Sequence, residues 1–183
     1  LEEMREAAGY PRGADGTRFE LTMVASPHGD EPLRTSEYMR EQFRQIGINL
    51  VIVSSDTGAY VKRVYTDRDY DLNMYVAASG ADPVVGIHRF YKSSAIKPGV
   101  AYTNISGFQN EEVDALLDAA EIELDAAKRR EQYKRFQQVV MSELPSLPII
   151  ATKQITVVNK RVHDHTLGAI GAVGSIAEAW LED

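Results

Sequence analysis

The sequence predicts an α/β fold in which a βαβαβ core precedes a C-terminal pair of helices and additional strands. The first half of the chain alternates strand patterns with helix patterns, and the connections between them are short. The second half carries two helical apolar stripes in succession. Strands that are separated by helices form parallel sheets with right-handed crossovers. We therefore expect three parallel strands, with ligands bound at their carboxyl ends.

Apolar patterns predict the three core strands and the helices between them. Residues 19–23 alternate apolar and polar side chains, as a half-buried strand does. The continuous β-branched run at 48–53 indicates a strand covered on both faces, and 72–76 alternates as a third strand. A helix is expected at 35–46, where apolar residues recur at helical spacing. Asp56 is expected to cap a second, short helix.

The second half is predicted to be more helical. Asn110 and Asp125 are favourable N-caps, and an apolar stripe follows each of them. The apolar runs at 148–151 and 154–158 predict two further strands. At the other end of the chain, residues 1–8 present an apolar helical face.

The composition is that of an ordinary globular domain and excludes several kinds of function. The 183 residues are 44% hydrophobic and 26% charged, with a net charge of −7. An acidic chain is a poor nucleic-acid binder and does not favour an anionic membrane surface. Without cysteine there is no disulfide, thiol catalyst or thiolate metal site. The chain begins without methionine and without a signal-peptide pattern, so we expect it to be a segment of a longer protein.

Few motifs of known chemistry are present. The sequence has no Walker-type loop, no GxGxxG motif and no GxSxG elbow. The one histidine cluster is His163-Asp164-His165, where a metal would need a third ligand that the sequence does not show. We interpret this cluster as a solvated turn rather than a metal site. Neither a metal nor a cofactor is expected.

Basic residues gather on the second helix of the predicted pair. They are interpreted as a solvated face whose cations pair with nearby acids, because the chain as a whole is acidic. An anion or nucleic-acid site is the alternative. The cations are Lys128, Arg129, Arg130, Lys134 and Arg135, and the acids are Glu121, Glu123 and Glu131.

The segment "SGADPVVGIHRFY", residues 79–91, follows the third predicted strand. Asp82 precedes a proline, and we interpret it as a cap of the turn in preference to a ligand contact. His88 is open to two interpretations, a hydrogen bond to a ligand or exposure to solvent. A serine, an acid and a histidine in one loop also permit a small hydrolase-like enzyme that uses Ser79, Asp82 and His88.

Several stretches together resemble a known family. They include "EAAGYPRGADGTRFELTMV", "EYMREQFRQIGINLVIV", "YVKRVYTDRDYDLNMYV", "GADP", "NISGFQNEEVDALLDAA" and "RREQYKRFQQVVMSELPSLPII". In this order and spacing they are similar to the C-terminal portion of the family 5 extracellular solute-binding proteins. These are the oligopeptide- and dipeptide-type receptors of ATP-binding-cassette importers.

The resemblance implies a fold and a role. The fold is a three-layer-like lobe of a type II periplasmic binding protein, with residues 1–183 as one C-terminal ligand-binding lobe and 162–183 as its weakly defined tail. Such receptors close two lobes over a small-molecule solute, deliver it to the permease subunits of the importer, and catalyse nothing. The implied location is periplasmic or extracytoplasmic, with either a signal or a lipid anchor N-terminal to this segment. Without the N-terminal lobe, self-association through exposed apolar surface is expected.

In this family the segment after the "DYDL" strand faces the solute cleft. The resemblance therefore implies ligand contacts from Tyr75, Ala78, Ser79, Gly80, Asp82, His88 and Arg89. Peptide receptors of the family can place an acid here for the peptide ammonium group, but residues 77–80 contain none. Ser79 and the Gly80 backbone can instead donate hydrogen bonds to a neutral or anionic solute, and Tyr75 can stack. The rival interpretations are the hydrolase-like enzyme and a structural interaction module.

Overall fold

The computed structural model describes residues 9–78, 80, 82–151, 155, 157–165 and 176–182. The chain forms two compact units, of which the first contains Leu1–Ala77 and Ile96–Ile105 and the second contains Ala78–Ala95 and Ser106–Asp183. The helix predicted at 1–8 lies outside the described residues.

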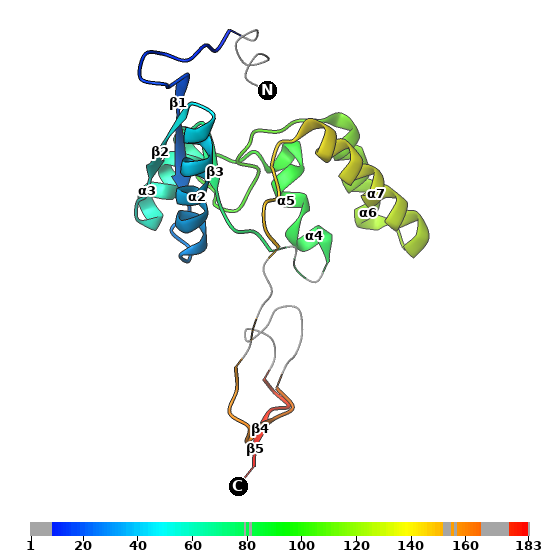
Figure 1. Ribbon diagram of the computed structural model, residues 1–183. Helices are drawn as coiled ribbons and strands as arrows, with labels where there is room; N and C mark the ends of the chain where they lie inside the picture. Colours follow the sequence, from blue (N-terminus) through cyan, green and yellow to red (C-terminus); the bar gives the residue numbers. More distant parts are fainter. Residues whose placement is uncertain are drawn as a thin grey trace. The chain divides into compact units, whose positions relative to one another are not determined.

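A three-stranded parallel sheet is the centre of the first unit (Figure 1). Strand β1 (Phe19–Ala25) lies between β2 (Ile48–Val53) and β3 (Leu72–Met74), and both neighbours run parallel to it. In this register Met23 is opposite Ile52 on one side and Leu72 on the other. The three predicted strands and their parallel pairing are therefore confirmed.

The prediction that residues 48–53 form a strand covered on both faces is wrong. β2 is an edge strand of this sheet, and Leu50 is its one fully buried residue, whereas Val51 is exposed. The most deeply buried strand is β1, in which Met23, Val24 and Ala25 are all buried. A β-branched run shows strand preference but does not reveal how many neighbours the strand has.

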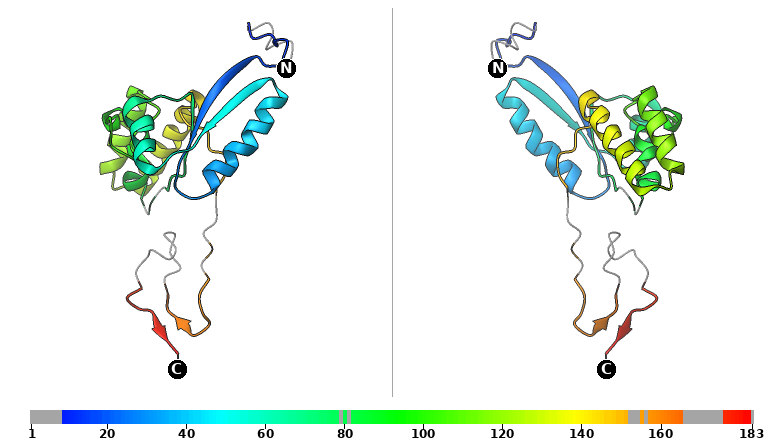
Figure 2. Two further views of the ribbon diagram at one scale, coloured as in Figure 1. Left: turned by 90° about the vertical axis from the view of Figure 1, so that its left-hand side faces the viewer. Right: turned by 90° about the vertical axis from the view of Figure 1, so that its right-hand side faces the viewer.

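Two helical segments pack against the sheet of the first unit. Helix α2 (Glu31–Gln45) runs alongside β1 and β2 (Figure 2). Helix α3 (Thr57–Val61) begins at Asp56, whose side chain accepts a hydrogen bond from the Ala59 N–H as predicted. It continues as a π-helical turn, η1 (Lys62–Asp67). The core under this segment consists of Val24, Tyr60, Val64, Tyr65 and Ile105.

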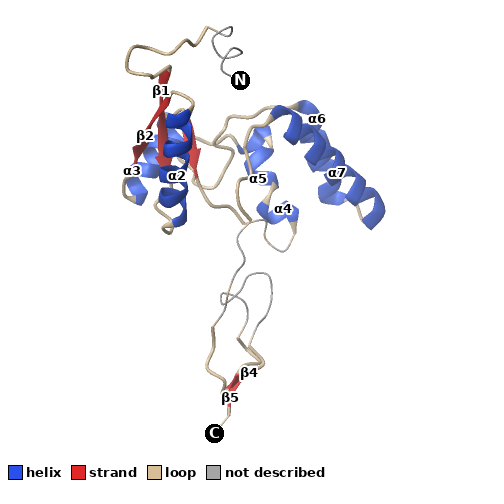
Figure 3. Ribbon diagram, viewed as in Figure 1, coloured by secondary structure: helices blue, strands red, loops and turns tan. Residues whose placement is uncertain are grey.

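The described part of the second unit is built mainly from helices (Figure 3). Three short ones come first: α4 (Pro83–Gly86), α5 (His88–Tyr91) and the 3-10 turn η2 (Ser93–Ala95). The helical pair follows as α6 (Glu111–Ile122) and α7 (Ala126–Glu143). The side chains of Asn110 and Asp125 accept hydrogen bonds from the first-turn amides of these helices, so both predicted caps are confirmed.

The apolar stripes of α6 and α7 face each other and form the core of the second unit. Its buried members are Val113, Leu117, Phe136, Val139 and Val140. Ile87, between α4 and α5, and Tyr91 of α5 pack against this core. Tyr91 stacks edge-on against Phe136, and its hydroxyl is 2.7 Å from the Ser146 hydroxyl.

The strands predicted at 148–151 and 154–158 are not found among the described residues of those stretches. Ile149, Ile150, Ile155 and Val157 have 47–90% of their surface exposed, and no neighbouring strand pairs with the described residues here. An isolated apolar run cannot form a strand, because its backbone groups need a partner.

The tail contains a two-stranded antiparallel sheet of β4 (Val162–His163) and β5 (Trp180–Leu181). The His163 ring stacks on Trp180 at a centroid distance of 4.4 Å, and the Trp180 indole N–H donates to Asp164. The first residue of the His163-Asp164-His165 cluster therefore takes part in aromatic stacking. Among the described residues, no group of three or more acidic, histidine or cysteine side chains is placed to hold a metal ion.

Within the same described part of the chain, none of the helices combines the length and the apolar character needed to cross a bilayer.

The core of the helical pair makes a testable prediction. Leu117 is completely buried between α6 and α7, so Leu117→Ala should lower the free energy of unfolding by about 3 kcal/mol, through lost apolar contacts and the cavity left behind. Leu124 is 97% exposed, and Leu124→Ala is the matched control with a change below about 0.5 kcal/mol. Urea unfolding of the three proteins measures both values. Equal stability of the two variants would show that the predicted core is wrong.

Candidate functional site

The segment that follows β3 contains all the residues expected to contact a ligand. Tyr75 is half-buried and packs against the core of the first unit. Ala78 and Gly80 belong to the second unit and are exposed, and Ser79 lies outside the described residues. Arg89 is exposed, with its guanidinium carbon 4.9 Å from the centroid of the Phe90 ring. The exposed residues of the described segment are Val76, Ala77, Ala78, Gly80, Val85 and Arg89.

Asp82 caps helix α4, as the sequence predicts. Its backbone is extended, its Oδ1 accepts a hydrogen bond of 2.9 Å from the Val84 N–H, and Pro83 occupies the first helical position. Proline suits that position because the first amides of a helix have no partner within it. Asp82 therefore has a structural role, and its expected ligand contact remains a prediction.

The same carboxylate forms a bidentate ion pair with Arg129 of α7. Arg129 Nη1 donates to Asp82 Oδ2 and Nη2 donates to Oδ1, each at 2.8 Å. The Arg129 Nε–H donates to the carbonyl of Ala120 in α6 at 2.8 Å. Because the planar guanidinium matches a carboxylate with two parallel bonds, this arrangement is stronger and more directional than a single-point ion pair.

This ion pair corrects the interpretation of the basic helix face. Arg129 does not pair with the predicted acids but with Asp82, which is 47 residues away in the sequence. Arg135 pairs with Glu112 of α6, and Lys134 pairs with Glu131 as expected. The missed signal was weak: one arginine in a run of cations cannot be assigned to a distant acid from local spacing.

His88 is buried, so the interpretation that it faces solvent is wrong. It is 4% exposed, and its Nε2 is 2.9 Å from the Tyr133 hydroxyl. Its Nδ1 has no hydrogen-bond partner among the described residues and is 3.8 Å from Glu121 Oε2. Burial lowers the pKa of His88, and the Lys92 ammonium lowers it further. A neutral, buried imidazole at this position helps to hold α5 against α7.

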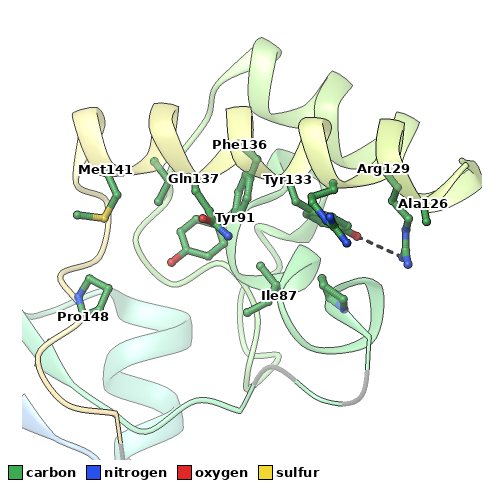
Figure 4. A pocket seen from close by; sticks show the side chains of 12 residues that line it. Ile87, Tyr91, Ala126, Arg129, Tyr133, Phe136, Gln137, Met141 and Pro148 are labelled. Carbon is green, nitrogen blue, oxygen red and sulfur yellow. Dashed lines mark hydrogen bonds between the residues drawn. The ribbon is translucent and has the colours of Figure 1, made fainter.

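A groove of about 530 Å³ lies beside this network, in the second unit (Figure 4). Its walls are largely apolar, and the described ligand-contact candidates are absent from its lining. Ile87, Tyr91, Tyr133 and Phe136 all line it. The volume is within the range of small-molecule sites. The complete lining is Pro83, Ile87, Tyr91, Ala126, Arg129, Arg130, Tyr133, Phe136, Gln137, Val140, Met141 and Pro148.

No family model matches the chain. A curated relative, the di/tripeptide-binding protein 3 of Pseudomonas aeruginosa, is 26% identical over 162 residues, which cover 88% of this chain and 30% of the relative. This chain is a homologue of bacterial peptide-binding proteins. The homology confirms the resemblance to the family 5 solute-binding proteins. The chain spans about 30% of the length of three such relatives.

Two solved structures have a similar fold. The dipeptide-binding protein from Pseudoalteromonas sp. SM9913 in complex with Met-Leu matches with a TM-score of 0.76 at 24% identity, over 99% of this chain and 35% of that one. NikZ from Campylobacter jejuni in complex with Ni(L-His) matches with a TM-score of 0.66 at 20% identity, over 79% of this chain and 30% of that one. These likenesses confirm the predicted fold class, an α/β type II periplasmic binding protein.

The Asp82–Arg129 ion pair makes a prediction about acid titration. The side-chain hydrogen bonds from Arg129, with help from the Val84 N–H, lower the pKa of Asp82 from 3.8 to about 2. The folded-state pKa lies below the unfolded value, so the stabilisation is complete above pH 3.8 and is lost as the pH falls through about 2.

The carboxyl carbon resonance of Asp82 followed by NMR measures this pKa. In Arg129→Ala it should rise toward 3.8, because the largest cause of the shift is removed. Arg135→Ala removes another arginine of α7 that is paired elsewhere, and should leave the titration of Asp82 unchanged. A midpoint near 3.8 in the unsubstituted chain would contradict the ion pair.

Proposed function

We propose that this chain is a solute-binding part of an extracytoplasmic receptor that delivers a small solute to the permease of an ATP-binding-cassette importer. The observation that carries the proposal is homology to a di/tripeptide-binding protein along 88% of the chain. A fold shared with a dipeptide-binding protein supports it. In this proposal the receptor is periplasmic, catalyses no reaction and closes an N-terminal lobe over the solute.

The proposed solute contacts are those of the segment after β3: Tyr75, Ala78, Ser79, Gly80, Asp82, His88 and Arg89. Asp82 and His88 are held by defined hydrogen bonds, because both carboxylate oxygens of Asp82 accept from Arg129 and the Nε2 of His88 is bonded to Tyr133. Ala78 and Gly80 are exposed, and in this proposal the solute contacts the protein at their backbone. A solute held in this way is recognised by hydrogen bonds to its polar groups and not by a carboxylate of the protein.

The hydrolase-like alternative lacks support from the geometry. Its acid, Asp82, is engaged by an arginine, and its base, His88, is bonded to a tyrosine hydroxyl. A catalytic base has to reach the nucleophile whose proton it removes. The binding role is therefore the better interpretation of the same residues.

A titration with dipeptides tests the proposal. Adding Met-Leu to the ¹⁵N-labelled chain should shift the Gly80 amide resonance and leave that of Gly16, in a turn of the first unit, unchanged. N-acetyl-Met-Leu, which has no ammonium group, should bind equally well, because Asp82 is neutralised by Arg129 and residues 77–80 contain no acid. A dissociation constant on the order of 1 mM is expected, since a single wall buries little of the ligand.

Two outcomes would count against this account. If neither peptide, nor glutathione as a larger probe, shifts any resonance of residues 75–91, the solute-binding role fails. If only the peptide with a free ammonium group binds, the role stands but the proposed mode of recognition is wrong.

A further inference from the structure

We propose that Arg129 is a positioning residue for solute binding: through Asp82 it fixes helix α4, and through α4 it fixes the exposed Gly80 backbone. The inference rests on the proposed function, because it concerns the same segment. Arg129 itself lies on α7, far from that segment in the sequence, and was expected to be solvated.

Every nitrogen of the Arg129 side chain has an assigned contact. Nε donates to the Ala120 carbonyl near the end of α6, and the two terminal nitrogens donate to Asp82. The guanidinium carbon lies 5.4 Å from the centroid of the Tyr133 ring, one turn further along α7. A guanidinium that is held at three points cannot rotate away from Asp82 without losing contacts to two helices. The Arg129 side chain therefore links α6 and α7 to Asp82 in a defined geometry.

Asp82 connects Arg129 to α4 through its own hydrogen bonds with the first turn of that helix. Its Oδ1 accepts from the Val84 N–H, and its main-chain carbonyl accepts from the Val85 and Gly86 amides. The first turn of α4 is thus hydrogen-bonded to the residue that Arg129 holds. A helix of four residues is not stable alone, because forming the first turn loses more conformational entropy than its one hydrogen bond offsets. Its order depends on contacts of this kind.

Gly80 lies close to that turn. It has a φ of +69°, and a Cβ added to it would lie 3.7 Å from the Gly86 nitrogen and 3.7 Å from the Asp82 carbonyl oxygen. The Gly80 backbone therefore follows the position of α4. A shift of the helix start would move the group that we propose to contact the solute.

A second contact joins the segment to the same face of α7. Tyr133 is hydrogen-bonded to His88 of α5 at 2.9 Å and lies 3.5 Å from Arg129 Nη2. Arg129 and Tyr133 are four residues apart and so lie on one side of the helix. Between them they hold the starts of α4 and α5, two helices too short to be stable alone.

Loss of the Asp82–Arg129 ion pair is expected to affect only the structure near the start of α4. The side chains of Arg129 and Asp82 are 27% and 41% exposed, and partly exposed ion pairs add little to global stability. Loss of the pair should release the start of α4 while α6 and α7 remain folded. This pattern distinguishes a positioning residue from one that merely stabilises the fold.

Hydrogen exchange of single variants and their combination tests the proposal. Asp82→Asn keeps a good N-cap but removes the charge, whereas Arg129→Ala removes the ion pair and leaves the cap. Each should accelerate exchange of the Val84–Ile87 amides by about tenfold relative to the α6 and α7 amides. The double variant should be no faster than Arg129→Ala, because the two residues act through one contact. Arg129→Lys should recover part of the protection, since lysine keeps the charge but not the bidentate geometry.

Arg135→Ala is the matched control, because Arg135 is also on α7 and pairs with an acid of α6, Glu112, through Nε at 2.6 Å. It should leave the exchange of α4 unchanged. In the same samples, Arg129→Ala and Asp82→Asn should weaken Met-Leu binding, followed at the Gly80 amide, by about tenfold, whereas Arg135→Ala should not.

The two readouts separate this proposal from the proposed function. Unchanged exchange in Arg129→Ala and Asp82→Asn, or faster exchange spread evenly over α6 and α7, would overturn the positioning role. Faster local exchange with unaltered Met-Leu affinity would overturn it as well, while leaving the solute-binding function in place. If the exchange pattern is as expected but the unsubstituted chain does not bind Met-Leu, the proposed function fails and with it the role of Arg129 in binding.

Discussion

The bidentate contact between Asp82 and Arg129 is the interaction on which the candidate site depends. The segment from Gly80 to Tyr91 contains two helices of four residues each, and neither is long enough to be stable alone. The stability of α4 and α5 must therefore come from tertiary contacts. The ion pair supplies one at the start of α4, the His88–Tyr133 bond supplies a second, and packing of Ile87 and Tyr91 on the α6–α7 core supplies the third.

The same contact determines what the segment offers to a solute. Asp82 is neutralised and His88 is buried with its neutral form favoured, so both are engaged within the protein. Ala78, Gly80 and Arg89 are the exposed members of the described contact set. One relative of this fold was solved with Met-Leu and another with Ni(L-His), which shows that the fold accommodates different ligands.

Local rules predicted much of the fold, and non-local contacts account for what they missed. Asp56, Asn110 and Asp125 were identified as caps because an N-cap needs only the next three residues. The parallel sheet followed from the alternation of strand and helix. The edge position of β2 and the absence of strands among the described residues of 148–158 depend on which neighbours are present, and no local pattern records them. Within the site, the cap role of Asp82 was predictable, whereas its pairing with Arg129 spans 47 residues.

The most direct test of the account is a measurement of where a peptide touches the protein. Nuclear Overhauser effects between unlabelled Met-Leu and the ¹⁵N-labelled chain report protons within about 5 Å, the contact range of a bound ligand. The account predicts cross-peaks from the peptide to the amides of Ala78 and Gly80. Cross-peaks confined to the groove residues Tyr91 and Met141, or none at any peptide concentration, would contradict it.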